Sequence, residues 1–157
     1  MFYSVGGQGL INLNSNSSAI LNSQPASQSL SIIGITYGFD TRKRGFNPDA
    51  GLTIDLTQEV AGLGGESKYI KTKAAVGGEI ETVSGNLTLM GKIEAGRLQS
   101  LSGVSSVLDR YFANGGAVRG FEYHGLGPRD QGAQNNDALG GNLFSALRLE
   151  ANFPIGF

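Results

Sequence analysis

The chain has 157 residues and a formal net charge of −1, so it has the length of one domain and no charge bias toward nucleic acid or an anionic membrane surface. It contains no cysteine, which excludes a disulfide framework and a thiolate metal site. Its 25 glycines, together with many Ser, Thr and Asn residues, suit turns and small-residue strand faces better than helices.

The sequence carries no helical membrane span and no export signal of its own. No apolar run approaches the ~18 residues that a membrane-spanning helix needs. Transmembrane strands are not excluded by this, because each needs only ~9–11 residues and carries a weak alternating signal. The N-terminal segment "MFYSVGGQGL" has neither the basic region nor the compact apolar core of a signal peptide. The protein is therefore either cytosolic or an internal piece of a longer exported chain.

The predicted elements are strands. Residues 1–13 are apolar enough for a strand, although three glycines weaken that prediction, and the Ser- and Asn-rich residues 12–29 are predicted to form a loop. From Ser31 onward apolar and polar residues alternate in long segments joined mostly by short turns. These segments are 31–40, 51–62, 68–82, 86–98 and 142–155. The pattern predicts an all-β antiparallel meander of about six strands, with no helix of useful length.

One face of each predicted strand is apolar, and the other carries charges of both signs with Gly and Thr. We expect the apolar set to face lipid on the convex side of a barrel wall, and Thr53, Asp55 and Lys92 to face a wet interior. The apolar set is Ile33, Ile35, Leu52, Ile54, Leu56, Leu87, Leu89, Leu147 and Leu149. A soluble sandwich or calyx would alternate in the same way. The barrel is favoured because strands of ~10 residues exceed the usual 5–6 and because no segment is available to cover the apolar face.

The long irregular stretch at about 99–140 is the main candidate for function. It is well beyond the ~12–15 residues of ordinary connections, which indicates a functional or a disordered loop. Its centre, "GGAVRGFEYHGLGPRD" at 115–130, is not of low complexity.

This stretch resembles the signature loop of the BamA superfamily of outer-membrane assembly and translocation proteins. The motif "VRGF" at 118–121 is followed in order by "GPRD", "DALGGNLF" and "LEANFPI". The resemblance covers about residues 31–157 and favours the assembly branch, with its bacterial surface antigen domain. It implies a sixteen-stranded transmembrane barrel preceded by periplasmic POTRA repeats. Residues 1–157 are therefore expected to be a fragment from the middle of such a barrel, without the seam at which clients are thought to enter.

The same resemblance implies a site on the loop. Arg119, flanked by Val118 and Gly120, is expected to fold back into the barrel lumen and to pair with Glu150 on the next strand. A carboxylate suits the planar guanidinium fork. Gly120 would permit an unusual dihedral angle, and Phe121 would anchor the loop against the wall. Two alternatives stay open: Arg119 is a solvated loop residue, or Glu150 pairs across strands with Arg148 or Lys92.

The function implied is non-enzymatic insertion of outer-membrane proteins in a Gram-negative bacterial outer membrane. The expected partners are client outer-membrane proteins, the lipoproteins of an assembly machinery and outer-membrane lipids, with no nucleic acid. No catalytic residue, cofactor or metal is expected, because His124 is the only histidine and no acid–histidine pair is apparent. The alternatives are translocation or secretion of one dedicated substrate by another branch of the superfamily, a passive pore, and a soluble ligand-binding β-domain.

Overall fold

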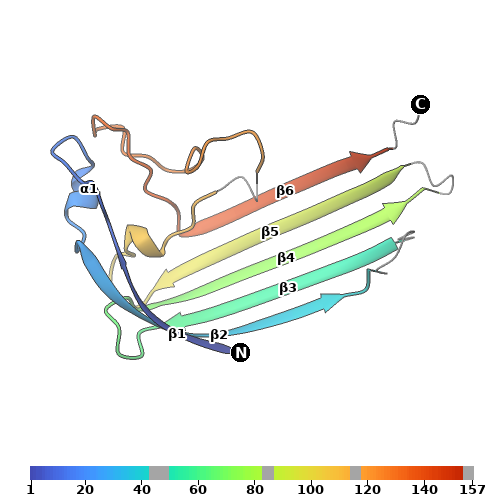
Figure 1. Cartoon of the computed structure of the whole chain (residues 1–157), viewed down its shortest axis with the longest axis horizontal. Helices are drawn as coiled ribbons and strands as arrows, with labels where there is room; N and C mark the ends of the chain where they lie inside the picture. The colour runs from blue at the N-terminus through green and yellow to red at the C-terminus, as the bar shows by residue number, and fades with distance from the viewer. Residues whose placement is uncertain (43–49, 83–86, 114–117, 154–157) are drawn as a thin grey trace.

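The computed structural model describes residues 1–42, 50–82, 87–113 and 118–153, and it contains one six-stranded sheet (Figure 1). Each strand pairs antiparallel with the next one in the chain, so the predicted all-β meander is confirmed. The strands are β1 (Phe2–Gly9), β2 (Ser27–Asp40), β3 (Ala50–Ala61), β4 (Tyr69–Glu81), β5 (Thr88–Ser100) and β6 (Leu143–Asn152). In the described part of the chain β1 and β6 do not pair with each other, so the sheet is open at both edges.

The register gathers the apolar residues on one face. Ile54 lies opposite Val76, Val76 opposite Ile93, and Ile93 opposite Leu147, so a single apolar row crosses four strands. The predicted outward set falls on this face by the same pairing, apart from Leu87, which lies just before β5 begins. Large apolar side chains stay exposed along this face. A soluble sheet would bury it, so the face is suited to lipid.

The opposite face is polar and concave. Thr53 lies opposite Gly77, and Gly77 opposite Lys92, as the strand parity predicts. The connection between β5 and β6 lies against this face and contacts both edge strands of the sheet. Asp109 accepts a hydrogen bond from Gln8 of β1, and Tyr111 stacks on Phe144 of β6. The sheet therefore curves around the loop, and its apolar face is the convex one.

The N-terminal third differs in part from the prediction. Strand β1 forms in spite of its glycines, because β2 supplies backbone hydrogen-bond partners that do not depend on side chains. The segment predicted as a loop over 12–29 contains a short helix, α1 (Ala19–Asn22), and β2 already begins at Ser27. Ser18 caps α1 by accepting a hydrogen bond from the Ile20 backbone at 3.1 Å. No helix in the described ranges has the length and apolar character to cross a membrane.

Two small apolar clusters lie at the end of the sheet that carries the long loop. One joins Leu21 of α1 to Val107 and Leu139 of the loop. The other sits on the sheet itself and consists of Ala61, Tyr69 and Leu98, with Leu30, Ile32 and Tyr111 packed around it. The first cluster packs the long loop against the β1–β2 connection, and the second packs Tyr111 of the loop against the sheet. The buried apolar residues in the described part of the chain therefore position the loop.

Candidate functional site: the long loop on the polar face

The loop spans residues 101–142, between the end of β5 and the start of β6, close to the predicted 99–140. It begins with a short 3-10 helix, η1 (Val107–Asp109). In Figure 1 this helix, much of the described loop and α1 lie near the end of the sheet where β1 and β2 curve up beside them. The candidate site consists of this loop and the polar wall beneath it.

Tyr111 fixes the start of the loop to three strands. Its hydroxyl donates to the carbonyl of Thr72 at 2.9 Å, its ring stacks on Phe144 with centroids 5.9 Å apart, and the Lys71 ammonium lies 4.6 Å from the ring centre. Burial raises the pKa of the Tyr111 hydroxyl to about 12, which keeps the donor protonated. A Cβ on Gly96 would lie 2.6 Å from the ring, so this position must be glycine for Tyr111 to dock.

Asp109 is a second anchor and is only 6% exposed. Its Oδ1 accepts from Gln8 Nε2 at 2.6 Å and from Ser67 Oγ at 3.3 Å, while Lys71 Nζ donates to its backbone carbonyl at 2.9 Å. Burial raises the pKa of the Asp109 carboxyl, and its hydrogen bonds and Lys71 only partly oppose that shift. The carboxyl therefore joins β1 and the β3–β4 turn to the loop, and the backbone carbonyl of Asp109 joins β4 to it.

A third set of contacts joins the loop to the β1–β2 connection. Ser18, which is fully buried, donates from its backbone N–H to Asp137 at 2.6 Å and from its hydroxyl to Asp130 at 2.5 Å. The hydrogen bond from Ser18, with backbone donors of the loop, lowers the pKa of Asp130. Arg129 stays inside the loop and donates to the carbonyls of His124 and Asn136. The two connections thus form one hydrogen-bonded layer over the end of the sheet.

The "VRGF" motif lies further along the loop. Arg119 Nη2 is 3.2 Å from Glu150 Oε1, and Arg148 Nε is 3.3 Å from the same oxygen. Glu150 Oε1 is buried and accepts no hydrogen bond of good geometry in the described residues, so both contacts are ionic. The Arg119 side chain is 74% exposed. The structure therefore brings Arg119, Arg148 and Glu150 together, and the anchoring role of Arg119 stays a prediction.

The neighbours of Arg119 behave differently from one another. Gly120 has φ +88°, a left-handed conformation that glycine adopts without strain. Val118 is half-buried. Phe121 is 52% exposed, and its expected role as an anchor of the loop stays a prediction; Tyr111 is an aromatic side chain that contacts the wall, at Phe144. The motif lies near residues 114–117, which are outside the described part.

The wall below the loop is strongly charged. Glu94, 8% exposed, lies 3.2 Å from Lys73 Nζ and 2.5 Å from Lys92 Nζ. Lys92 thus pairs with Glu94, whereas the ion pairs of Glu150 in the described residues are with Arg119 and Arg148. These ion pairs satisfy the charge of the Glu94 carboxylate, which is largely removed from bulk solvent.

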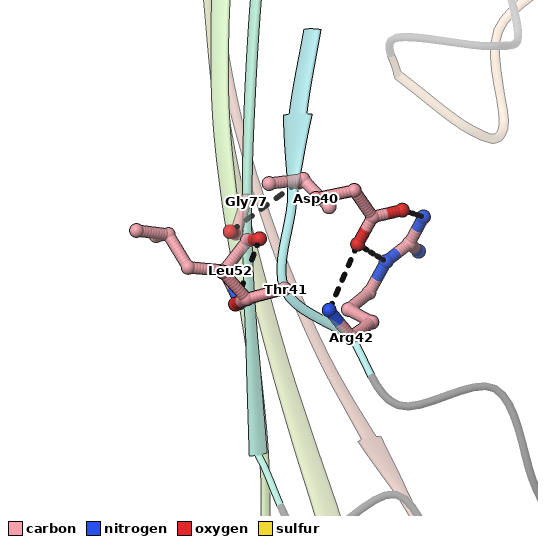
Figure 2. A network of polar contacts seen from close by, with 6 residues as sticks. Asp40, Thr41, Arg42, Leu52 and Gly77 are labelled. Atoms are coloured by element: carbon pink, nitrogen blue, oxygen red, sulfur yellow. Dashed lines mark hydrogen bonds and ion pairs between the residues drawn. The ribbon is translucent and has the colours of Figure 1, made fainter.

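At the far end of the wall, Asp40 holds Arg42 where β2 meets its turn. The Asp40 carboxylate accepts from the backbone, Nε and Nη2 of Arg42 at 2.8–3.0 Å, beside the paired backbones of Thr41 and Leu52 (Figure 2). A shallow polar depression of about 160 Å³ lies near this pair. Its charged lining consists of Arg42, Glu79, Lys92, Arg148 and Glu150. Polar groups therefore continue along the concave face from the loop to the opposite turns.

His124 stacks between Phe112 and Tyr123, with ring centroids 4.3 and 4.0 Å away. Burial and the nearby Arg129 lower its pKa, which favours the neutral ring. No group of three metal-ligating side chains occurs among the described residues. The candidate site as a whole consists of a loop fixed on the sheet and of paired charges on the wall beneath it. Such a site is suited to bracing the sheet or to binding another molecule.

Sequence reasoning missed the residues that dock the loop most firmly, namely Ser18, Asp109 and Tyr111. Two of them had a signal. Ser18 precedes "AILN" as a helix N-cap does, and Tyr111 begins an aromatic pair with Phe112 in the long loop. Asp109 had none, because its partner Gln8 lies 101 positions away in the sequence.

The comparisons with known proteins agree with this arrangement. The model of the Omp85 superfamily domain matches residues 5–157. The outer membrane protein assembly factor BamA of Neorickettsia risticii (strain Illinois) is 27% identical over 154 residues, which cover 98% of this chain and 20% of that protein. The sorting assembly machinery 50 kDa subunit of Saccharomyces cerevisiae is 29% identical over 138 residues, covering 84% of this chain and 27% of that protein. The chain thus spans between 20% and 27% of the length of these relatives.

Proposed function

Because this chain belongs to the Omp85 superfamily, we propose that it is a six-stranded part of the barrel of an outer-membrane protein assembly factor. Residues 1–157 would then form one piece of a larger barrel domain. Two features support this: both sheet edges are open in the described residues, and the matched region is a small share of each relative. Unpaired edges require partner strands, so β1 and β6 would each pair with a further strand of the same barrel.

The observation that carries the proposal is the docking of the 101–142 loop on the concave polar face. Anchors on β1, β4, β5 and β6 hold it there, at Gln8, Lys71, Gly96 and Phe144. A loop held inside a barrel restricts the lumen and braces the wall. Such a barrel needs no chemical step, because the free energy of client folding can drive insertion. We therefore assign no catalytic residue and no cofactor.

The proposed partners follow from the two faces. Client outer-membrane proteins and the lipoproteins of an assembly machinery would meet the complete barrel, and outer-membrane lipids would meet the convex face. One relative is named for assembly in a bacterial outer membrane and the other for a yeast sorting and assembly machinery. We propose the bacterial outer membrane, since the bacterial relative matches more of the chain. Secretion of a single substrate by another branch of the superfamily is the competing outcome.

Charge reversal at the loop motif tests the proposal in the intact protein. Arg119→Glu and Glu150→Arg should each speed proteolysis of the loop and slow client assembly, because each replaces an attraction by a repulsion. The Arg119 side chain is 74% exposed, so the pair should contribute only ~0–1 kcal/mol, equal to at most about a fivefold change in cleavage. The double variant should recover in part only, because Arg148 would repel the new arginine.

Glu122→Arg is the matched control, since it reverses an exposed charge of the same loop. It should leave both readouts at wild-type levels. If Arg119→Glu and Glu150→Arg behave like this control, the motif does not anchor the loop. If client assembly is normal when the loop is visibly loosened, the loop does not serve assembly and a different function is indicated.

A further inference from the structure

A groove opens on the convex apolar face near the turn end of β4 and β5. It has a volume of about 450 Å³ and a surface made almost wholly of carbon. Its floor is the pair Gly78 and Gly91, which lie directly opposite each other, and its walls are Ile80, Leu89 and Leu149. This volume falls within the ~300–1,000 Å³ of sites that take a small molecule.

The two floor glycines have no explanation within the chain. A Cβ on Gly96 or on Gly77 would lie 2.6 or 2.7 Å from Tyr111 or Thr53, so glycine is required at those inward positions. At Gly78 and Gly91 the nearest atoms would be 3.7 and 3.4 Å away, which is ordinary contact, and neither glycine has a positive φ. Since glycine weakens a strand, the space above this pair is better explained by an occupant from outside the chain.

The groove lies on the convex apolar face, and the exposed apolar residues around it indicate the chemistry of the occupant. The rows on either side of the glycine pair consist of Val76 and Ile93, and of Ile80 and Leu89, all between 43% and 59% exposed. The groove is thus a notch in the membrane-facing surface, and no described segment covers it. It is near the end of the strands opposite the long loop, since Ile80 is the last residue but one of β4 and Leu89 is the second of β5.

We propose that this groove holds one acyl chain of a phospholipid from the membrane leaflet next to the short turns. The inference rests on the proposed function only in requiring that the convex face meets lipid. Because lipid tails are as apolar as leucine, the driving force is close packing and not removal from water. A chain seated between Leu149 and Ile80 over bare backbone makes contacts on three sides, whereas a chain on the neighbouring rows touches only side-chain tips.

The test measures binding at the groove by fluorescence quenching in the intact protein. Residues 1–157 contain no cysteine. With any cysteine elsewhere in the intact protein replaced by serine, Ile80→Cys carries a bimane reporter in the wall of the groove, and Leu56→Cys carries one elsewhere on the same face. The purified protein in detergent micelles is titrated with phosphatidylcholine brominated on its acyl chains. The reporter at position 80 should reach half-quenching at about a tenfold lower lipid fraction than the one at position 56, equal to ~1.4 kcal/mol.

Two paired variants separate the groove from general apolar bulk. Gly78→Val with Gly91→Val fills the floor, and should shift half-quenching at position 80 to the value seen at position 56. Ala74→Val with Ala95→Val adds β-branched bulk to the same face and the same two strands, and should leave the titration unchanged. Valine suits exposed strand positions, so both pairs should fold.

Each of the other possible quenching results contradicts one specific part of the proposal. If positions 80 and 56 titrate equally, or if Gly78→Val with Gly91→Val has no effect, the groove does not bind an acyl chain more tightly than the rest of the face. The statement that the convex face meets lipid would be unaffected. Quenching at position 56 but never at position 80 would show that protein covers the groove. Absence of quenching at both positions would refute the membrane placement itself, and with it the proposed function.

Discussion

Removal of the Tyr111 side chain should release the start of the long loop from the sheet. Tyr111→Ala deletes a hydrogen bond to Thr72 at 2.9 Å, worth ~1 kcal/mol, and a stack on Phe144, worth ~0.5–1.5 kcal/mol. It also deletes the contact with the Lys71 ammonium, worth ~0.5–1 kcal/mol. The sum is about 2–3.5 kcal/mol of docking free energy, which equals roughly a 30- to 300-fold larger undocked population.

The assay is limited trypsin cleavage at Arg129 within the loop of the membrane-embedded protein. When opening is fast relative to cleavage, the cleavage rate follows the undocked population. Tyr111→Phe keeps the ring and loses only the hydrogen bond, so it should accelerate cleavage about fivefold. Tyr123→Ala removes a 78%-exposed tyrosine of the same loop and should have little effect. Cleavage of Tyr111→Ala at the wild-type rate would refute the anchor assigned to this ring.

Three further changes test the other anchors. Because burial raises the pKa of Asp109, docking of the loop is strongest below the usual carboxyl pKa and weakens as the pH rises through the raised value. Asp109→Asn should abolish this pH dependence of hydrogen exchange in the loop. If the variant keeps the wild-type pH profile, Asp109 does not cause the dependence. Ser18→Ala should cost ~1–2 kcal/mol and speed exchange in α1 and around Asp130 together; an effect on α1 alone would show that the two connections are independent. Gly96→Ala should displace Tyr111 and mimic its removal in the trypsin assay, whereas Gly38→Ala should not, since its Cβ would meet nothing closer than 3.4 Å.

The sheet was predictable because its signal is local. A strand in a barrel wall repeats its alternation over ten or more residues, so parity in 51–62 or 86–98 defines both the element and its faces. The early start of β2 at Ser27 was missed because the sequence there carries no such local signal. There the polar side chains gave no alternation, and backbone pairing with β1 alone extends the strand.

The docking of the loop was predictable only in outline. Its length and its motif indicated function, and the contact between Arg119 and Glu150 lies where the family resemblance implied. Phe121 was expected to anchor the loop and is half-exposed, and an aromatic residue in an irregular segment has no periodicity to show whether it points inward. Asp109 could not be assigned a partner at all, since one sequence contains no information on which of its distant polar residues meet in space.

The separation of the loop's partners along the chain also sets an order of events in folding. Each hairpin of the meander closes locally, so β2 to β5 can pair one after another as the chain collapses. The bonds from Gln8 to Asp109 and from Ser18 to Asp130 and Asp137 join residues 101, 112 and 119 positions apart. Their loop-closure entropy is repaid only after the strands between them are in register. Docking of the loop is therefore a late folding step, and it occurs only when the strands beneath the loop have paired in the native register.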